Sequence, residues 1–123
     1  MRRIEIEMPP SRLRVGRAAV PSWLGDGVFP RRLPIQVARL NQTLLLAVPF
    51  ELNVEIGLAW KAEAAKRGYD LILVGYANEY AGYVVPEATY ATEKYEARTS
   101  FYGAQLVNYL TEVVVKLMES FEK

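Results

Sequence analysis

Two short stretches carry the side chains whose types could do chemistry. Glu51 follows the apolar run 43–48, and the segment 78–83 (Asn-Glu-Tyr-Ala-Gly-Tyr) follows the apolar run 71–74. A carboxylate and phenols that converge at one place could bind a hard or borderline cation. The alternative is structural: Glu51 complements the N-terminal dipole of a helix, and the tyrosines cover the edge of a sheet. The residue types alone favour the structural alternative.

The sequence contains no histidine and no cysteine. Without cysteine, disulfides and thiolate metal sites are excluded. Without histidine, the commonest zinc ligand and the usual general base are missing. The serines have no histidine to activate them, which excludes a serine–histidine triad. No glycine-rich phosphate loop stands between a strand and a helix.

A strand–helix–strand unit is expected to position the two stretches. We predict a strand over 43–48, a helix over 52–67 and a strand over 70–76, which form a right-handed βαβ unit with parallel strands. The apolar run within the second strand is typical of burial on both faces. Because ligands bind beyond the carboxyl ends of such strands, Glu51 and the segment 78–83 should emerge at the same edge. Helical spacing predicts that the buried face of the helix consists of Val54, Leu58, Ala62 and Ala65.

The remaining elements complete an α/β fold with a mixed sheet of about four or five strands. Residues 3–8 alternate as a half-buried strand, and residues 33–40 form a strand joined to the next by Asn41-Gln42. All 123 residues form a single domain: residues 1–32 supply an N-terminal strand and a long Pro/Arg-rich loop, and residues 33–123 form the α/β core. A long C-terminal helix presents the apolar stripe Leu106, Leu110, Val113, Val114, Leu117 and Phe121.

Charge is distributed unevenly along the chain. Residues 1–39 hold eight arginines against three acids, and residues 40–123 hold seven basic against eleven acidic side chains. Arginines without lysine or a recognised motif do not indicate nucleic acid, and pairing with the chain's own second half or with another copy is favoured. The loop 9–32 either lies over the core with Trp23 as its anchor or binds a partner. No apolar stretch approaches the ~20 residues of a membrane span and no signal peptide is present, so a cytoplasmic location is expected.

Several motifs occur in an order that resembles a known enzyme family. They are Ala47-Val-Pro-Phe-Glu51, Val74 to Val84, Pro86-Glu87, Tyr90, Tyr95-Glu96-Ala97 and Tyr102-Gly103. Together they resemble the neutral/alkaline non-lysosomal ceramidases, whose pattern runs V-P-G-E, then a helix, then N-x-Y-x-x-Y and Y-E-x-A-S-T-x-Y-G. The likeness covers about Leu33 to the C-terminus. It implies that the chain corresponds to the C-terminal part of the catalytic domain.

The resemblance implies a zinc amidase that cleaves the N-acyl bond of ceramide. Carried over by position, Glu51 and Tyr83 are zinc ligands, and Tyr95 is a catalytic tyrosine that assists at the scissile carbonyl. Zinc acidifies a bound water and polarises the amide, so no covalent nucleophile is needed. The family's two histidine ligands do not occur in this sequence. Further departures are Phe50 in place of glycine, Leu52-Asn53 in place of small and hydroxyl residues, Val84-Val85 where V/I-T-T is usual, and Glu93-Lys94 where Q-x is usual.

Three functions are consistent with these residues. In the first, a companion polypeptide brings the histidines and completes a split ceramidase-like amidohydrolase. The isolated chain would then bind no zinc and be inactive, because two ligands are too few for a catalytic zinc. In the second, the chain is a non-catalytic homo-oligomer, and in the third it binds a small molecule, lipid or N-acyl amide at the old site. We expect either a homo-oligomer or a complex with a companion, with an interface that includes the segment 9–32.

Overall fold

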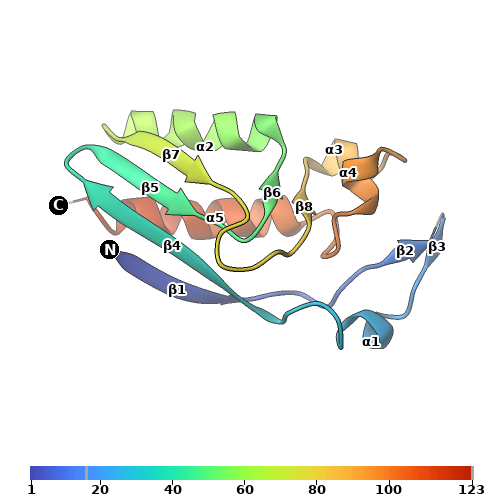
Figure 1. Ribbon diagram of the computed structural model, residues 1–123. Helices are drawn as coiled ribbons and strands as arrows, with labels where there is room; N and C mark the ends of the chain where they lie inside the picture. Colours follow the sequence, from blue (N-terminus) through green and yellow to red (C-terminus); the bar gives the residue numbers. More distant parts are fainter. Residues whose placement is uncertain (16, 123) are drawn as a thin grey trace.

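Two helices pack on one face of a four-stranded sheet in the computed structural model, which describes residues 1–15 and 17–122 (Figure 1). The strand order is β1–β4–β5–β7, with bounds Arg2–Glu7, Arg32–Leu40, Thr43–Ala47 and Asp70–Val74. The β1–β4 and β4–β5 pairs are antiparallel, whereas β5 and β7 are parallel. Helices α2 (Val54–Lys66) and α5 (Leu106–Glu119) lie behind the sheet in the view of Figure 1. This arrangement confirms the predicted α/β fold with a mixed sheet and a long C-terminal helix.

The predicted βαβ unit is present as β5, α2 and β7, with each element slightly shorter than predicted. The register pairs Leu44 with Leu71 and Ala47 with Val74. Asn53 delays the start of the helix, because its side chain accepts a hydrogen bond from the Glu55 N–H at 3.0 Å and caps the first turn. The two residues before this cap belong to a short strand, β6 (Glu51–Leu52).

The buried face of α2 differs from the prediction. Ile56, Trp60 and Ala64 face the core, whereas Leu58 is 60% exposed. Trp60 decides the rotation of the helix: its large ring is buried, and its indole N–H donates to Thr111 Oγ1 of α5 at 2.9 Å. The predicted face of Val54, Leu58, Ala62 and Ala65 is exposed to solvent, and the prediction of that face was wrong.

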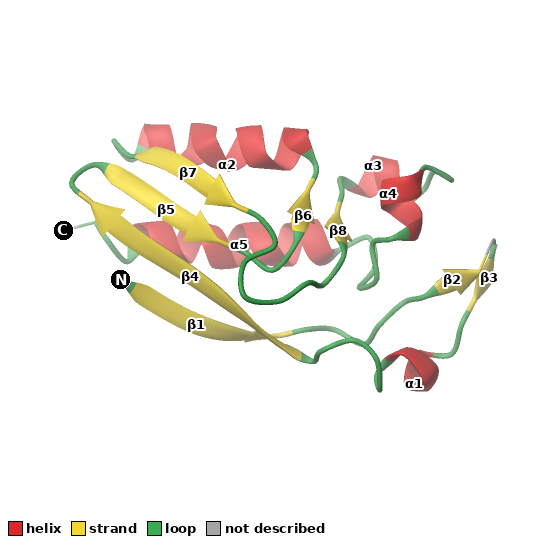
Figure 2. Cartoon of the chain, viewed as in Figure 1, coloured by secondary structure: helices red, strands yellow, loops and turns green. Residues whose placement is uncertain are grey.

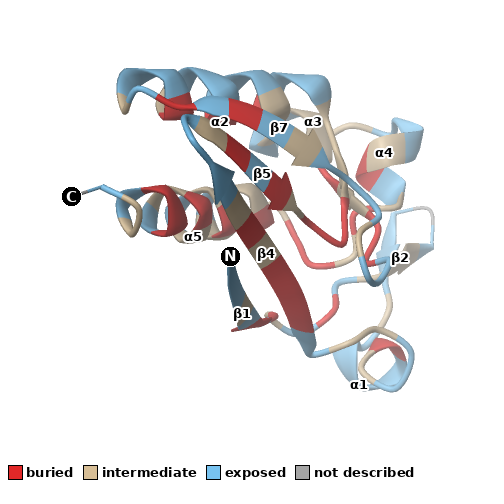
Figure 3. Ribbon diagram, turned by 60° about the vertical axis from the view of Figure 1, so that its left-hand side comes forward, coloured by how far each residue is buried: buried red, intermediate tan, exposed pale blue. Residues whose placement is uncertain are grey.

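The face of the sheet opposite the helices is open, so the prediction that 71–74 is buried on both faces was also wrong. Leu71 points into the core, but Ile72 and Val74 are exposed, as is Leu45 on the neighbouring strand. Figure 3 shows buried and exposed residues alternating along β5 and β7. A continuous apolar run cannot distinguish burial on both faces from a strand whose second apolar face is uncovered.

The N-terminal and C-terminal elements close the core as predicted. Ile6 of β1 and Met8 after it are buried, and α5 buries Leu106, Leu110, Val114 and Leu117 of the predicted stripe. Asn41 takes a φ of 55° in the β4–β5 turn, a left-handed conformation that asparagine tolerates in hairpins. None of the helices in the described residues is both long and apolar enough to span a membrane.

The loop predicted over 9–32 contains short elements and is not anchored by Trp23. The elements are β2 (Arg14–Val15), β3 (Ala18–Ala19) and α1 (Ser22–Gly25). Trp23 is 72% exposed, whereas the Phe29 ring packs on Phe101 at 4.4 Å between centroids. Phe29 is therefore an anchor of this segment, and the interpretation of Trp23 as its anchor was wrong.

Arginines of the first third contact the chain's own second half, through backbone carbonyls more than through the acidic side chains that were predicted. Arg2 donates to the Ser120 carbonyl at 2.8 Å, Arg39 donates to the Phe121 carbonyl at 3.0 Å, and Arg17 pairs with Glu93 at 3.3 Å. These contacts join the N-terminal third of the chain to its C-terminal half.

Candidate functional site

Strands β6 (Glu51–Leu52) and β8 (Tyr83–Val84) bring two of the three candidate residues into register. They pair in parallel, with Glu51 opposite Tyr83. The Glu51 N–H donates to the Gly82 carbonyl at 3.0 Å, and the Asn53 N–H donates to the Val84 carbonyl at 2.9 Å. Figure 2 shows this small sheet between the main sheet and the short helices α3 (Glu87–Tyr90) and α4 (Tyr95–Arg98). Both stretches therefore emerge at the same edge, as predicted.

Backbone geometry between β7 and β8 explains why the chain turns back here. The Ala77 N–H donates to the Val48 carbonyl at 3.0 Å, and the Ala81 N–H donates to the Pro49 carbonyl at 2.8 Å. Gly82 has a φ of +80°, and a Cβ at this position would lie 2.5 Å from the Thr99 carbonyl oxygen. Only glycine fits without displacing the backbone, and this close approach sets the path into β8.

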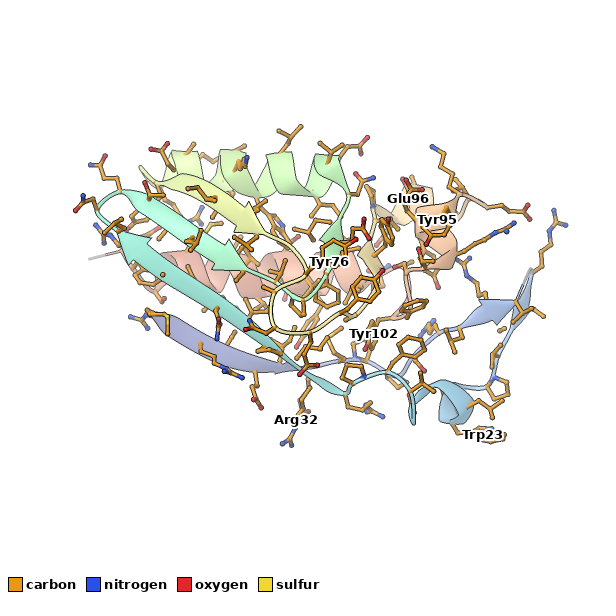
Figure 4. All side chains as sticks on the ribbon, in the orientation of Figure 1. Trp23, Arg32, Tyr76, Tyr95, Glu96 and Tyr102 are labelled. Atoms are coloured by element: carbon orange, nitrogen blue, oxygen red, sulfur yellow. The ribbon has the colours of Figure 1, made fainter. Side chains whose placement is uncertain are left out.

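Three tyrosines lie close to the Glu51 side chain, and a fourth packs on one of them. The rings of Tyr76 and Tyr80 stack with centroids 5.3 Å apart, and the ring of Tyr95 meets that of Tyr83 edge to face at 5.8 Å. Tyr95 comes from α4 and is exposed, whereas Tyr83 is half-buried. Figure 4 shows Tyr76 and Tyr95 in the same part of the molecule, near the carboxyl ends of β5 and β7. The site thus brings together all three predicted residues, Glu51, Tyr83 and Tyr95.

The Glu51 carboxylate controls the protonation of the nearest phenols. Hydrogen bonding to Glu51, followed by burial, raises the pKa of Tyr76 to about 12. The same causes, in the same order, raise the pKa of Tyr83 well above its ordinary value. For Tyr80, burial is the main cause of a raised pKa, and the Glu51 charge adds to it. At neutral pH these phenols keep their protons, so Tyr76 and Tyr83 can act as donors beside the carboxylate.

Tyr76 is a site residue that the sequence did not identify. It lies directly after the strand β7 and has a φ of 55°, which turns its side chain back toward Glu51. Positive φ at a bulky non-glycine residue is unusual and often occurs at functional sites. No pattern in the sequence around Gly75-Tyr76 indicates this conformation, so no signal pointed to it.

Glu51 and Tyr83 fit a zinc ion only in part. They provide two oxygen ligands, whereas catalytic zinc sites have three protein ligands. Within residues 1–15 and 17–122, no group of three or more histidine, cysteine, aspartate or glutamate side chains could hold a metal ion. A metal ion bound at this pair would need further ligands from outside the described residues.

An apolar groove of about 380 Å³ begins at the site and runs between α2 and β7. Glu51 and Tyr76 line one part of it, and Lys61 of α2 also lines it. Its apolar walls include Val54 and Leu58, which the rotation of α2 leaves exposed, together with the half-buried Leu52 and Leu73. Phe50 is buried beneath them. Such a groove, mostly apolar with a few polar groups, is typical of a small-molecule site.

The chain matches a family model described as neutral/alkaline non-lysosomal ceramidase, N-terminal, over residues 10–112. The match starts closer to the N-terminus than the predicted start near Leu33. The neutral ceramidase of Pseudomonas aeruginosa is 38% identical over 79 residues, and that of Mycobacterium tuberculosis is 29% identical over 108 residues. These alignments cover 60% and 82% of this chain but only 12% and 17% of the two relatives.

Solved structures show the same likeness. The crystal structure of neutral ceramidase from Pseudomonas aeruginosa superimposes with a TM-score of 0.65 and 32% identity. The superposition covers 75% of this chain and 16% of that protein. The family model matches most of the chain, including strands β4, β5 and β7, helix α2 and the Glu51–Tyr83 pair. The chain therefore belongs to the neutral/alkaline non-lysosomal ceramidase family, of whose members it spans a small part.

Proposed function

We propose that this chain supplies the glutamate and tyrosine side of a zinc-dependent site that hydrolyses N-acylated long-chain amines such as ceramide. The pairing of Glu51 with Tyr83 in β6 and β8 is the observation that carries the proposal. It joins the two residues that the family resemblance names as metal ligands. Membership of the ceramidase family supports the substrate class.

Each residue of the site has a separate role in the proposal. Glu51 and Tyr83 would hold zinc, which when bound polarises the amide carbonyl and lowers the pKa of a bound water. Tyr76, which keeps its proton beside Glu51, would donate to the carboxylate and so orient it. The exposed phenol of Tyr95, held against the Tyr83 ring, can donate to the carbonyl oxygen of a bound amide.

A companion polypeptide that carries histidines completes the site in this proposal. The chain has no histidine, and two oxygen ligands do not suffice for a catalytic zinc. We therefore expect the isolated chain to contain no stoichiometric zinc after dialysis and to hydrolyse no amide. Because Tyr83 keeps its proton at neutral pH, binding of a cation at this pair releases that proton and strengthens as the pH rises.

A second candidate function is the binding of a lipid or N-acyl amide without catalysis. The groove between α2 and β7 favours it, since its apolar walls suit an aliphatic chain and it lies within this polypeptide alone. The two candidates differ in what they require. Catalysis needs the companion, whereas binding in the groove does not.

Hydrolysis of a fluorogenic N-acylsphingosine tests the proposal. The tagged chain is purified from its own host with whatever polypeptide accompanies it, and both zinc content and turnover are measured. We expect activity in the complex, its loss in Glu51→Gln and Tyr83→Phe, and none in the chain alone. Glu55→Gln is the matched control, because Glu55 is exposed in the first turn of α2 and should leave activity intact.

Two results would decide against parts of this proposal. Activity of the complex that survives Glu51→Gln would remove Glu51 from the metal site. Turnover by the isolated chain that Glu51→Gln abolishes would show that no companion is needed. Amide binding by the chain, with no turnover in any complex, would support the non-catalytic candidate.

A further inference from the structure

Residues 11–15 and 17–32, here called the N-terminal arm, are held together by contacts between Ser11, Gly25, Asp26 and Arg31. Ser11 is buried, and its N–H and Oγ both donate to Asp26 Oδ1 at 3.2 Å. Gly25 lies so close that a Cβ there would come within 2.2 Å of Ser11 Oγ. Arg31 pairs with the other carboxylate oxygen of Asp26 at 3.5 Å. These contacts fix α1 against the start of the arm.

The arm is also fastened to the body of the protein. The Arg14 guanidinium lies over the Tyr90 ring at 4.1 Å and donates to the Ala97 carbonyl at 2.8 Å. At the other end, the Tyr102 hydroxyl donates to the Pro30 carbonyl at 2.8 Å, beside the packed Phe29 ring. The conformation of the arm is therefore fixed from within and at both ends.

Large apolar side chains of the arm point outward. Val15, Trp23 and Val28 are each more than 70% exposed, and Leu24 is exposed by half. Leu24 and Val28 are four residues apart in a stretch that continues helical hydrogen bonding, since the Val28 N–H donates to the Gly25 carbonyl at 2.8 Å. Figure 4 shows Trp23 at the end of the molecule, pointing away from the body. A fixed scaffold that buries Ser11 and half-buries Asp26 while it exposes tryptophan is the reverse of an ordinary surface.

Positive charge surrounds these apolar side chains. The arm carries five arginines and a single acid, Asp26. Arg12, Arg17 and Arg32 are exposed. Arg17 and Arg32 each form an ion pair at the solvent surface, and such exposed pairs are weak, so other anions can displace the carboxylates. Arginine around exposed tryptophan and aliphatic side chains matches the interface of a membrane, where anionic headgroups lie above the acyl chains.

We propose that the N-terminal arm binds the surface of an anionic lipid bilayer. Trp23, Leu24 and Val28 enter the headgroup region, and the exposed arginines contact lipid phosphates. The combination of excess positive charge with an exposed tryptophan favours a bilayer over a second copy of this chain, whose arm carries the same positive charge. Binding of this kind needs no membrane-spanning helix.

The arm adjoins the candidate site. Val28, Phe29 and Arg31 of the arm share a shallow hollow with Glu79 and Tyr80, and Tyr80 stacks on Tyr76 beside Glu51. A bilayer bound at the arm therefore lies next to the tyrosine cluster. The surface proposal does not depend on catalysis or on zinc.

Vesicle binding by the full chain, followed by tryptophan fluorescence, tests this proposal. The second tryptophan, Trp60, is buried and serves as a constant background, so a blue shift on binding reports Trp23. We expect binding to vesicles of phosphatidylcholine with phosphatidylglycerol, much weaker binding to phosphatidylcholine alone, and weakening by salt. Trp23→Ser should weaken vesicle binding about tenfold or more. Arg17→Gln and Arg32→Gln should each weaken it about fivefold, and vesicle sedimentation measures all of these changes.

Matched variants distinguish insertion of Trp23 into the bilayer from non-specific hydrophobic adsorption to vesicles. Leu40→Ser removes an equally exposed apolar side chain at the far end of β4 and should leave vesicle binding unchanged. Trp23→Phe should keep most of the binding and lose the fluorescence shift. Unchanged binding of Trp23→Ser, or equal binding to neutral and anionic vesicles, would overturn the proposal. A lipid-free dimer that Trp23→Ser dissociates, together with no vesicle binding, would assign the arm to a second copy and overturn it equally.

Discussion

At the scale of single residues, the candidate site is a carboxylate whose surroundings are phenols. Glu51 has Tyr83 opposite it in the β6–β8 register and Tyr76 as a second hydrogen-bonding phenol. Hydrogen bonding to Glu51, followed by burial, raises the pKa of both phenols. A cation that binds here must therefore displace the phenol protons. The chain alone therefore holds this pair in a protonated, hydrogen-bonded form.

Glu51→Gln should lower the pKa of Tyr76 from about 12 toward the ordinary tyrosine value of ~10, because the largest cause of the shift is removed. A spectrophotometric titration of tyrosinate measures this. Glu55→Gln is the control and should leave the titration unchanged. A titration curve identical in Glu51→Gln and the wild type would show that burial, and not Glu51, holds the proton.

Stability should fall at alkaline pH for the same reason. A tyrosine whose pKa is raised on folding stabilises the protein fully below its unfolded pKa of ~10, and that contribution is lost as the pH rises through the folded pKa. For Tyr76 and the buried Tyr102 the folded pKa is about 12, so the free energy of unfolding should decline between these two values. Urea denaturation across this range tests it, and Tyr102→Phe should flatten the decline.

Gly82→Ala should destabilise the protein more than Gly68→Ala. Both glycines have a similar positive φ, +80° and +76°, which costs about 1–2 kcal/mol for a residue with a Cβ. At Gly68 the added Cβ meets nothing within 4 Å, whereas at Gly82 it would clash with the Thr99 carbonyl and the Phe101 ring, adding about 1–3 kcal/mol. Chemical denaturation of the two variants gives the difference. Equal losses would mean that the turn into β8 relaxes freely.

At the scale of elements, the sequence predicted the βαβ unit but not the face that each element buries. Alternation and helical spacing identify strand and helix, and Asn41 marks the turn between β4 and β5, whereas the helix cap at Asn53 was not predicted. Helix α2, however, has apolar residues on two sides, and only the contact between Trp60 and Thr111 of a distant helix selects Ile56 and Ala64 over Leu58. The register between Glu51 and Tyr83 likewise depends on hydrogen bonds from both segments to distant parts of the chain, such as Tyr83 N–H to the Thr99 carbonyl. Tertiary contacts of this kind leave no local pattern.

The rotation of α2 gives a direct test in two substitutions. Ile56→Ala should cost about 2–5 kcal/mol of stability, because it opens a cavity beneath Trp60 in the core. Leu58→Ala should change stability by no more than ~0.5 kcal/mol, because Leu58 is mostly exposed. Urea denaturation of both variants measures this. A larger loss for Leu58→Ala would support the face predicted from the spacing.

At the scale of the whole molecule, the chain is a piece of the ceramidase fold with an uncovered sheet. One face of the sheet carries α2 and α5, and the other exposes Leu45, Ile72 and Val74. The relatives are far longer, since the chain spans 12% and 17% of the two proteins compared above. Exposed apolar surface of this kind marks an interaction site on proteins that are otherwise polar outside. The partner that completes the proposed site and the partner that covers this face can be the same polypeptide.

In the absence of a companion, we expect the isolated chain to self-associate through this face and the free edge of β7. Leu45 lies beside Ile72, and Ala47 beside Val74, so the apolar side chains form one continuous strip across two strands. Strand β7 has neither lysine nor proline, the residues that usually protect an edge from pairing with another chain. Light scattering coupled to gel filtration should show an oligomer at micromolar concentration, and Ile72→Lys should convert it to a monomer. Leu40→Lys, which changes an exposed leucine at the end of β4, should leave the oligomer intact. A monomeric wild-type chain would show that this apolar strip stays exposed to solvent and forms no interface. An oligomer that persists in Ile72→Lys would show that the interface lies on another surface.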